Sequence, residues 1–226
     1  DLIQTIADRN NLKVVIDGAQ SFGSKFNGQT DSTLGDISTT SFFPAKPLGC
    51  YGDGGAVFTD NDEYAEKIKM LRIHGQNQRY QHKYIGIAGR LDTIQAAILL
   101  AKLPHYKEEL LNRNYVAQSY SDELGDILKT PVIKKNRTSI WAQYTFKTNN
   151  RSDIQSKLKK SGIPTSVHYP LPLHLQSCFD FLKYKHGDFP IAEMTSKQVL
   201  SLPMNPFLTM DQIQYITSKV RQIVIE

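Results

Sequence analysis

Lys46 stands in a loop crowded with glycine and proline, and its amine is the first group in this sequence that could do chemistry. Glycines let the backbone turn tightly and approach a ligand closely. A lysine that such a loop desolvates is partly deprotonated, and its amine can form a Schiff base with a carbonyl carbon. Most lysines in loops of this kind are ordinary charged surface residues, so the neighbouring segments must decide between the two interpretations.

Three more functional groups lie near the ends of two predicted strands. Residues 13–17 are a short β-branched run without alternation, which predicts a strand buried on both faces of a parallel sheet. Residues 37–43 predict the next strand. If the two strands lie side by side, their carboxyl ends share one crevice, where the ligands of open α/β sheets collect. The groups gathered there would be the carboxylate of Asp17, the amide of Gln20, the hydroxyl of Ser41 and the amine of Lys46.

Pyridoxal phosphate (PLP) is a cofactor that needs this combination of groups. A lysine forms the Schiff base, an acidic partner keeps the pyridine nitrogen protonated so that the ring acts as an electron sink, and hydroxyl or N–H donors bind the phosphate. An aspartate that ends a strand is more often a simple turn or cap residue. Beside Ser41 and Lys46, however, a cofactor site is the better interpretation of Asp17.

The composition is that of a globular protein and argues against several functional classes. A chain of 226 residues with 40% hydrophobic residues can form a core, and its formal charge of +5 comes from scattered basic residues. No platform of aromatic and basic side chains is visible, so nucleic acid is not an expected partner. Two distant cysteines give neither a disulfide framework nor metal-ligand spacing, which suits a reducing cytoplasm. No apolar run is long enough to span a membrane, and His168 and His174 lack a third metal ligand.

Periodicity and capping signals outline the elements that must position these groups. Helices are predicted over residues 1–10, after a cap at Asp60 or Asn61, and over 93–124, 152–160, 192–200 and 210–225. Further strands are predicted over residues 56–59, 141–146 and 163–169. The polar segment 74–84 lacks periodicity and is a candidate binding loop. Residues 94–101 are apolar on most sides, which predicts burial between layers or between subunits.

Three stretches, residues 15–23, 41–49 and 52–55, together resemble the DegT/DnrJ/EryC1 family of PLP-dependent aminotransferases, which act on nucleotide-linked keto sugars. The likeness covers essentially the whole chain and includes residues 71–75, 86–97 and 168–174. It implies the α/β fold of the fold type I PLP-dependent transferases, which are similar to aspartate aminotransferase. Residues 1–124 are then the C-terminal part of the large PLP-binding domain, with a partial, mostly parallel sheet and the connecting helix. Residues 125–226 form a small C-terminal α+β domain.

The resemblance also implies a role for each candidate residue. Lys46 would bind the cofactor covalently and then move the proton between cofactor and sugar carbon. Asp17 would hold the pyridinium proton, Gln20 would lie beside the ring, and Ser41 would bind the phosphate. The residues implied to contact the sugar nucleotide are Arg79, Arg90, His168 and Tyr169. Members of the family build the active site across a homodimer. The segment 74–84 of one subunit would reach the active site of the neighbouring subunit.

The subgroup most similar to this sequence aminates 3-keto sugars, above all UDP-2-acetamido-2-deoxy-3-oxo-glucuronate, with L-glutamate as amino donor. Such a reaction serves the biosynthesis of cell-surface polysaccharides or glycans in the cytoplasm. A 4-keto-sugar aminotransferase is the alternative within the family, and a truncated, non-catalytic homologue that acts as a binding or regulatory module is the alternative outside it. Lys46 together with Asp17 favours catalysis, and it favours transamination over the hydroxyl removal of relatives that lack the lysine.

The chain departs from the family pattern in two places. Ala88 stands where many members have an asparagine that donates to the cofactor phosphate across the dimer, so that contact is not expected. Members of the family are also longer, and their N-terminal part holds a phosphate-binding turn and an aromatic residue that stacks on the ring. We therefore expect the chain to begin inside a domain and, by itself, to lack a complete cofactor site.

Overall fold

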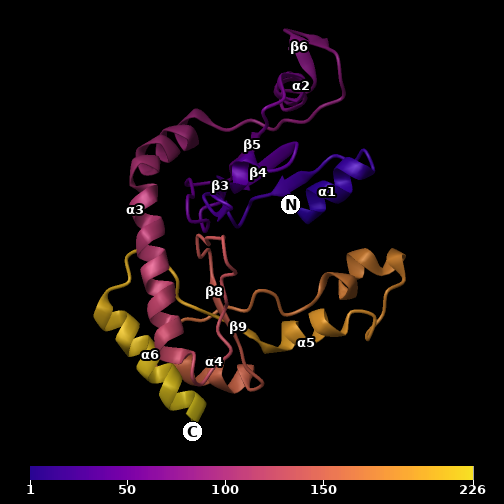
Figure 1. The fold of residues 1–226 in the computed structure, drawn as a ribbon. Helices are drawn as coiled ribbons and strands as arrows, with labels where there is room; N and C mark the ends of the chain where they lie inside the picture. The colour runs from indigo at the N-terminus through magenta and orange to yellow at the C-terminus, as the bar shows by residue number, and fades with distance from the viewer. Residues whose placement is uncertain (226) are drawn as a thin grey trace. The chain divides into compact units, whose positions relative to one another are not determined.

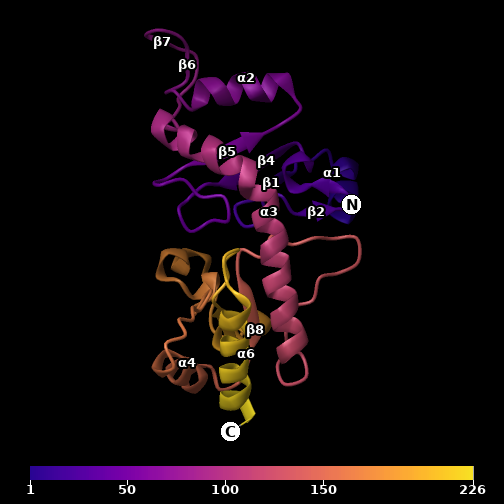
Figure 2. The same cartoon turned by 90° about the vertical axis from the view of Figure 1, so that its left-hand side faces the viewer.

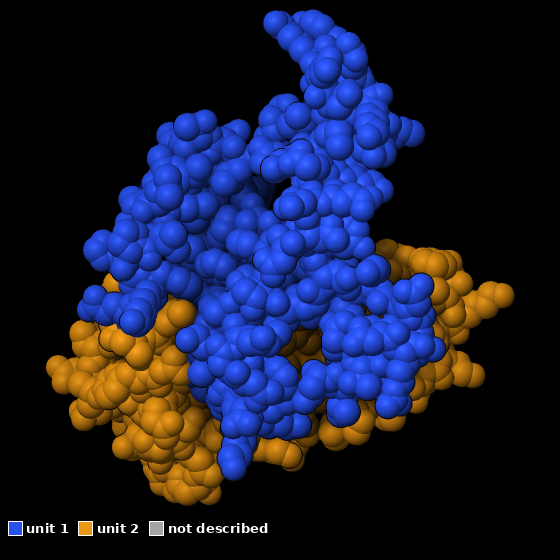
Figure 3. Space-filling model, turned by 45° about the horizontal axis from the view of Figure 1, so that its top comes forward, with its two compact units in different colours: residues 1–108, 133–142 blue, residues 109–132, 143–226 orange. Residues whose placement is uncertain are grey.

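The computed structural model describes residues 1–225 (Figure 1 and Figure 2). The chain divides into two compact units, unit 1 with residues 1–108 and 133–142, and unit 2 with residues 109–132 and those from 143 onward (Figure 3). The division falls within one long helix, α3 (Thr93–Leu124), whereas the predicted boundary lies just after that helix, near Gly125. The division into domains at this boundary stays a prediction.

Unit 1 is built on a three-stranded sheet with the strand order β1-β4-β5. β1 (Val15–Asp17) runs parallel to β4 (Ile37–Ser41), so the predicted side-by-side arrangement of these strands is confirmed. β4 runs antiparallel to β5 (Gly55–Phe58), which makes the sheet a mixed one. The antiparallel return follows from the connection, because parallel neighbours need a crossover that usually contains a helix, and residues 42–54 contain none.

The prediction that the first strand is buried on both faces is wrong for the described residues. β1 is an edge strand of this sheet, and Val15 is 62% exposed. The helix before it, α1 (Leu2–Arg9), forms as predicted and also exposes apolar side chains, including Leu2 and Ile3. The sequence run is apolar enough for a central strand, but its burial depends on neighbours that a short sequence window does not include.

The rest of unit 1 lies along the chain around this sheet. Asn61 caps α2 (Asp62–Leu71) by accepting a hydrogen bond from the Tyr64 N–H at 2.9 Å, as the sequence predicts. The remaining short strands form two hairpins, β2 (Lys25–Phe26) with β3 (Gln29–Thr30), and β6 (Gln76–Gln78) with β7 (Gln81–His82). The second hairpin lies beside α2 in both views (Figure 1 and Figure 2) and occupies the segment that was predicted to be an irregular loop.

Helix α3 extends over 32 residues without a break, although it contains Pro104. The sequence predicts burial of residues 94–101 between layers or between subunits, and the structure places the first half of the helix in two environments. Leu99 and Tyr106 are buried, whereas Ile94 and Leu100 are mostly exposed. The helix is therefore apolar on more sides than unit 1 covers.

Unit 2 packs helices against a two-stranded antiparallel sheet of β8 (Tyr144–Lys147) and β9 (Val199–Leu202). Its other elements are α4 (Arg151–Lys160), α5 (Pro190–Gln198), α6 (Met210–Ile225) and two 3-10 helices, η2 (Leu173–Leu175) and η3 (Ser177–Leu182). Its fully buried side chains come from helices and strands alike and include Tyr120, Tyr144, Phe146, Leu158, Leu200 and Val220.

The strand predicted over residues 163–169 is wrong, because this segment makes only an isolated bridge between Ser166 and Ser201. Pro164 removes a backbone donor from the segment, which disfavours a regular ladder. The true partner of β8 is β9, whose first residues were assigned to a helix. All four residues of β9 are buried, and a short, mostly apolar segment cannot be told from a helical segment by periodicity.

A buried carboxylate joins the irregular segment before α5 to that helix. Glu193, only 5% exposed, accepts hydrogen bonds through Oε1 from His174 Nε2 at 3.0 Å and from the Gly187 N–H at 2.8 Å. The same oxygen accepts a longer bond from the Phe189 N–H, and Oε2 pairs with His186 Nδ1 at 2.5 Å. Four donors, one in η2 and three in the segment directly before α5, thus depend on a single side chain.

The charge of Glu193 should make unit 2 sensitive to acid. Burial by itself raises the pKa of Glu193, but the hydrogen bonds from Gly187, His174 and Phe189 outweigh it, so the pKa lies below its ordinary value of 4.5. A carboxyl group whose pKa is lower in the folded than in the unfolded protein stabilises the fold at pH values above its ordinary pKa. This stabilisation is lost as the pH falls through the lowered pKa. In urea unfolding between pH 6 and about pH 3, the wild type should lose more stability than Glu193→Gln. The exposed Glu108→Gln should follow the wild type, and equal slopes for all three proteins would contradict the assignment.

Candidate active site

The carboxyl ends of β1 and β4 are joined by direct hydrogen bonds. The Gly18 N–H donates to the Thr39 carbonyl at 2.8 Å, and the Thr40 hydroxyl donates to the Gly18 carbonyl at 3.2 Å. A Cβ atom at Gly18 would lie 2.5 Å from the Thr39 oxygen, so only glycine permits this approach. Asp17 precedes Gly18, and Ser41 follows Thr40. Both residues therefore lie at the same edge of the sheet, the one formed by the carboxyl ends of β1 and β4.

The carboxylate of Asp31, which is not among the predicted site residues, holds the turn after β1. Asp31, 6% exposed, accepts hydrogen bonds from the Ser21 hydroxyl at 2.8 Å and from the Gly23 N–H at 3.0 Å. Gln20 sits in this turn with its side chain exposed. Asp31 lies in a polar stretch without periodicity, so no sequence signal distinguishes it from a surface residue. Its two bonds fix the backbone that presents Gln20.

Replacing Asp31 by asparagine should destabilise the protein by about 1–3 kcal/mol, the cost of leaving a buried donor without an acceptor. The amide keeps the shape of the carboxylate and one accepting oxygen, but its NH₂ group cannot accept, so either the Ser21 hydroxyl or the Gly23 N–H loses its acceptor. The free energy of unfolding, measured with urea, reports this loss. Asp60→Asn, an exposed aspartate of the same unit, is the matched control and should change stability by less than about 0.5 kcal/mol. Equal stability of the two variants would show that Asp31 does not hold the turn.

Lys46 lies in a compact loop between β4 and β5, residues 42–54, which we call the Lys46 loop. The Lys46 N–H donates to the Phe43 carbonyl at 2.8 Å, and Ser41 Oγ accepts from the Phe43 N–H at 3.2 Å. The buried Cys50 thiol lies 3.0 Å from the Phe42 carbonyl oxygen, to which it donates. A Cβ atom at Gly49 would lie 2.6 Å from the Pro44 carbonyl oxygen. The loop thus folds back on itself with glycine at its closest approach.

Two side chains of α3 bind the backbone of the Lys46 loop. Lys102 Nζ donates to the Gly49 carbonyl at 2.5 Å, and Gln95 Oε1 accepts from the Tyr51 N–H at 2.8 Å. Lys46 itself is half-buried, and its amine has no hydrogen bond or ion pair to any of residues 1–225. The helix therefore holds the loop while the amine of Lys46 stays available for reaction.

The cationic residues proposed for the sugar nucleotide lie elsewhere in unit 1. Arg79, in the turn of the β6–β7 hairpin, donates to the Tyr80 hydroxyl at 3.1 Å and lies 5.0 Å from the centroid of that ring. Arg90 is exposed and follows a short bridge between Ile73 and Ala88. Neither arginine forms an ion pair with a carboxylate among the described residues.

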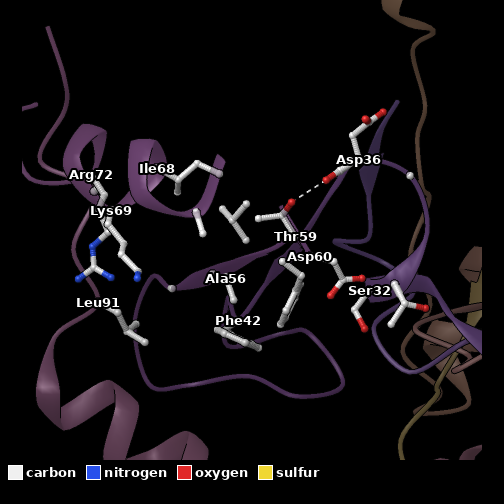
Figure 4. A pocket seen from close by; sticks show the side chains of 18 of the residues that line it. Ser32, Asp36, Phe42, Ala56, Thr59, Asp60, Ile68, Lys69, Arg72 and Leu91 are labelled. Carbon is white, nitrogen blue, oxygen red and sulfur yellow. Dashed lines mark hydrogen bonds between the residues drawn. The ribbon is translucent and has the colours of Figure 1, made fainter. Parts of the chain in front are cut away.

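A cavity of about 1000 Å³ in unit 1 does not coincide with the cofactor residues. Figure 4 shows Lys69 and Arg72 on one side of it, and on the other the 2.8 Å hydrogen bond from Thr59 Oγ1 to the Asp36 carbonyl. Of the eight candidate site residues, Arg90 lines this cavity, whereas Lys46 does not. The cavity therefore lacks the lysine that the predicted chemistry requires.

The two remaining candidates lie in unit 2. His168 and Tyr169 line a cavity of about 710 Å³, whose other walls come from residues 170–174 and from α5. His168 is half-buried and its Nδ1 lies 3.0 Å from Ser201 Oγ, while Tyr169 is largely exposed. The contact between His168 and Ser201 could not be predicted from the sequence, because the two residues lie on separate segments of the chain.

The groups at the strand ends fit PLP by their chemistry. Asp17 offers an exposed carboxylate, which among described residues accepts a hydrogen bond from the Ala19 N–H alone, at 3.1 Å. Ser41 offers a hydroxyl proton, and Lys46 offers an amine without a partner in the described chain. No group of three potential metal ligands occurs in residues 1–225. None of the described helices is long and apolar enough to cross a membrane.

Comparison with known proteins gives one consistent result. The model of the DegT/DnrJ/EryC1/StrS aminotransferase family matches residues 1–221. The chain is 45% identical to a UDP-2-acetamido-2-deoxy-3-oxo-D-glucuronate aminotransferase of Pseudomonas aeruginosa, over 96% of this chain and 60% of that protein. It is 43% identical to a protein of Geobacillus stearothermophilus named pleiotropic regulatory protein, over 98% of this chain and 61% of that one. Among solved structures, DesV of S. venezuelae superposes with a TM-score of 0.96 at 35% identity, over 99% of this chain and 61% of that one. The chain thus spans about three fifths of the length of these relatives.

Proposed function

The chain belongs to the DegT/DnrJ/EryC1/StrS aminotransferase family, and we propose that it carries the central catalytic residues of an enzyme that transfers an amino group from L-glutamate to a nucleotide-linked keto sugar. Aminotransferases of this family depend on PLP. One observation supports the proposal above the others. The parallel pairing of β1 with β4 brings Asp17 and Ser41 to one sheet edge, from which the Lys46 loop begins.

Each residue at this edge has a defined task in the proposal. When bound, PLP supplies an electron sink that stabilises negative charge at the reacting carbon. Asp17 accepts a hydrogen bond from the protonated ring nitrogen and keeps that proton in place by its negative charge. The hydroxyl of Ser41 would hold the phosphate as a hydrogen-bond donor, and Gln20 would lie beside the ring. Lys46 binds the cofactor through its amine and then carries a proton to and from the substrate carbon as a general base and acid.

The substrate we propose is a UDP-linked 3-keto sugar, with a 3-keto sugar acid as the first candidate. Two relatives support it, the P. aeruginosa enzyme named above and a UDP-N-acetyl-3-dehydro-alpha-D-glucosamine 3-aminotransferase of Acidithiobacillus ferrooxidans, 38% identical. Arg79 and Arg90 present guanidinium groups that can bind a carboxylate or a diphosphate with two hydrogen bonds each. His168 and Tyr169 are further residues that we propose to contact the sugar. We place the reaction in cytoplasmic glycan biosynthesis, in a homodimer whose active site is shared.

A regulatory binding module is the second candidate function. The relative from G. stearothermophilus bears the name of a regulatory protein and is nearly as similar as the P. aeruginosa aminotransferase. A module of this kind needs neither the amine of Lys46 nor the carboxylate of Asp17. Chemistry at Lys46 therefore distinguishes the two candidates.

Borohydride reduction in the presence of PLP, followed by peptide mass mapping, tests the proposal. The natural protein that contains this chain should carry one reduced cofactor on the peptide with Lys46. It should also form 2-oxoglutarate from glutamate in the presence of a UDP-linked 3-keto sugar, and a 4-keto sugar serves as the comparison. Lys25→Arg, which replaces an exposed lysine of the same unit, should leave the adduct unchanged. Absence of the Lys46 adduct would support the regulatory module instead.

A further inference from the structure

Ser201 is held in place from three sides in unit 2. Its backbone pairs with Thr145 of β8 in the register of the sheet. On its other edge it exchanges both backbone hydrogen bonds with Ser166, at 2.8 and 3.1 Å. Ser201 is 3% exposed. Its hydroxyl oxygen therefore has a fixed position between β8 and the segment that carries His168.

The Ser201 hydroxyl links two further side chains. Its Oγ lies 2.8 Å from Thr145 Oγ1 and 3.0 Å from His168 Nδ1. A hydroxyl has one proton to donate, and a neutral imidazole has one nitrogen that donates and one that accepts. The possible arrangements of their protons are therefore of two kinds, which differ in the tautomer of His168.

The position of the donor that is left without a partner favours one of the two arrangements. If His168 Nδ1 carries the proton, it donates to Ser201, and only one of the two hydroxyls can then donate to the other, so the hydroxyl proton of Ser201 or of Thr145 has no acceptor in the described residues. If Thr145 donates to Ser201 and Ser201 donates to Nδ1, both hydroxyl protons have acceptors, and the proton without a partner in the described residues is that on Nε2 of His168, which lines the 710 Å³ cavity. A donor costs free energy when it has neither a partner nor access to water, so the arrangement that leaves the free donor on the cavity-lining residue is favoured.

We infer that Thr145 and Ser201 are positioning residues that hold neutral His168 in the tautomer with the proton on Nε2. Nδ1 is then occupied as an acceptor, and Nε2, which has no hydrogen-bond partner in residues 1–225, presents an N–H donor. His168 lines the 710 Å³ cavity, so this donor is available to an oxygen of a bound ligand. The oxygen belongs to the sugar nucleotide if the proposed function holds, and on this point the inference rests on that proposal.

Solid-state NMR of the natural protein with ¹⁵N-labelled histidine tests the tautomer directly. Protonated and unprotonated ring nitrogens have distinct ¹⁵N shifts, and His168→Gln identifies the His168 signals by their disappearance. At a pH about two units above the ordinary histidine pKa of about 6.5, wild-type His168 should carry its proton on Nε2. Ser201→Ala and Thr145→Val should each give a mixture of tautomers. We call the hydrogen-bonded side chains of Thr145, Ser201 and His168 the relay. Thr195→Val removes a hydroxyl that lines the same cavity but is not part of the relay, and it should leave the tautomer unchanged.

A proton on Nδ1 in the wild type, or an unchanged tautomer in Ser201→Ala, would overturn the inference. Steady-state kinetics then test whether the tautomer of His168 affects binding of the sugar nucleotide. Ser201→Ala should raise the KM for the sugar nucleotide about tenfold, the effect of losing one hydrogen bond of about 1.4 kcal/mol, with little change in the reaction with glutamate. A mixed tautomer with an unchanged KM would overturn the positioning role. If Lys46 forms no adduct while the tautomer responds as stated, the proposed function fails and the relay stands.

Discussion

Replacing Lys46 by alanine should abolish amino transfer, with kcat falling by at least about 10³-fold, because one side chain supplies both the covalent attachment and the proton transfer. The structure separates this loss from a loss of folding. The Lys46 amine has no partner in the described residues, while the Lys46 loop is held by backbone bonds and by Lys102 and Gln95. Urea unfolding of Lys46→Ala should therefore match the wild type. Turnover is measured as 2-oxoglutarate formation with the full natural protein.

Lys46→Arg separates charge from nucleophilicity. Arginine keeps the positive charge but is not deprotonated in proteins, so it can neither bind the cofactor covalently nor act as a base. It should be as inactive as Lys46→Ala. Lys25→Arg should retain full turnover. Appreciable turnover in Lys46→Ala would contradict the assignment of this residue and the mechanism with it.

Replacing Phe146 by alanine should destabilise unit 2 by about 3–5 kcal/mol, the usual cost of removing a buried phenylalanine. Phe146 lies on β8, opposite Leu200 of β9, and both side chains are completely buried. The cost combines lost burial with the cavity that the surrounding side chains cannot fill. Thermal and urea unfolding with a probe in unit 2, such as the near-UV signal of its tyrosines, measures the change.

Phe207→Ala is the matched control for this experiment. Phe207 also belongs to unit 2, but its side chain is 75% exposed, so truncation should change stability by less than about 0.5 kcal/mol. Similar losses in the two variants would mean that Phe146 is not part of the core. A small loss in both would mean that the β8–β9 sheet does not carry the stability of unit 2.

The parts of the fold that follow from local chemistry could be predicted from the sequence. The cap at Asn61, the turn after Asp17 and the strand before Ser41 are encoded in a few neighbouring residues. The pairing of β1 with β4 was predicted because the functional groups at their ends make sense only together. The family was recognised from the resemblance of residues 15–23, 41–49 and 52–55 to its members, which composition alone does not reveal.

Other features could not be predicted because they depend on partners from other segments of the chain. Asp31 looks like a surface residue until the turn at Ser21 folds over it. β9 looks like the end of a helix until β8 pairs with it. The hydroxyl of Ser201 gains its meaning only when Thr145 and His168, 56 and 33 residues away along the chain, lie beside it. Such contacts are long-range hydrogen bonds, which leave no periodic pattern in a sequence window.

The anchoring of the Lys46 loop to α3 also limits how its length can vary. Residues added to an exposed loop usually cost little, because the entropy of loop closure rises slowly with length. In this loop the Gly49 carbonyl binds Lys102 and the Tyr51 N–H binds Gln95, and α3 sets the spacing of these two side chains. An insertion or deletion between Gly49 and Tyr51 would move one of the two backbone groups away from its partner. The spacing of Gly49 and Tyr51 is thus determined by α3, and sequence changes between them that spare function should substitute residues without adding or removing any.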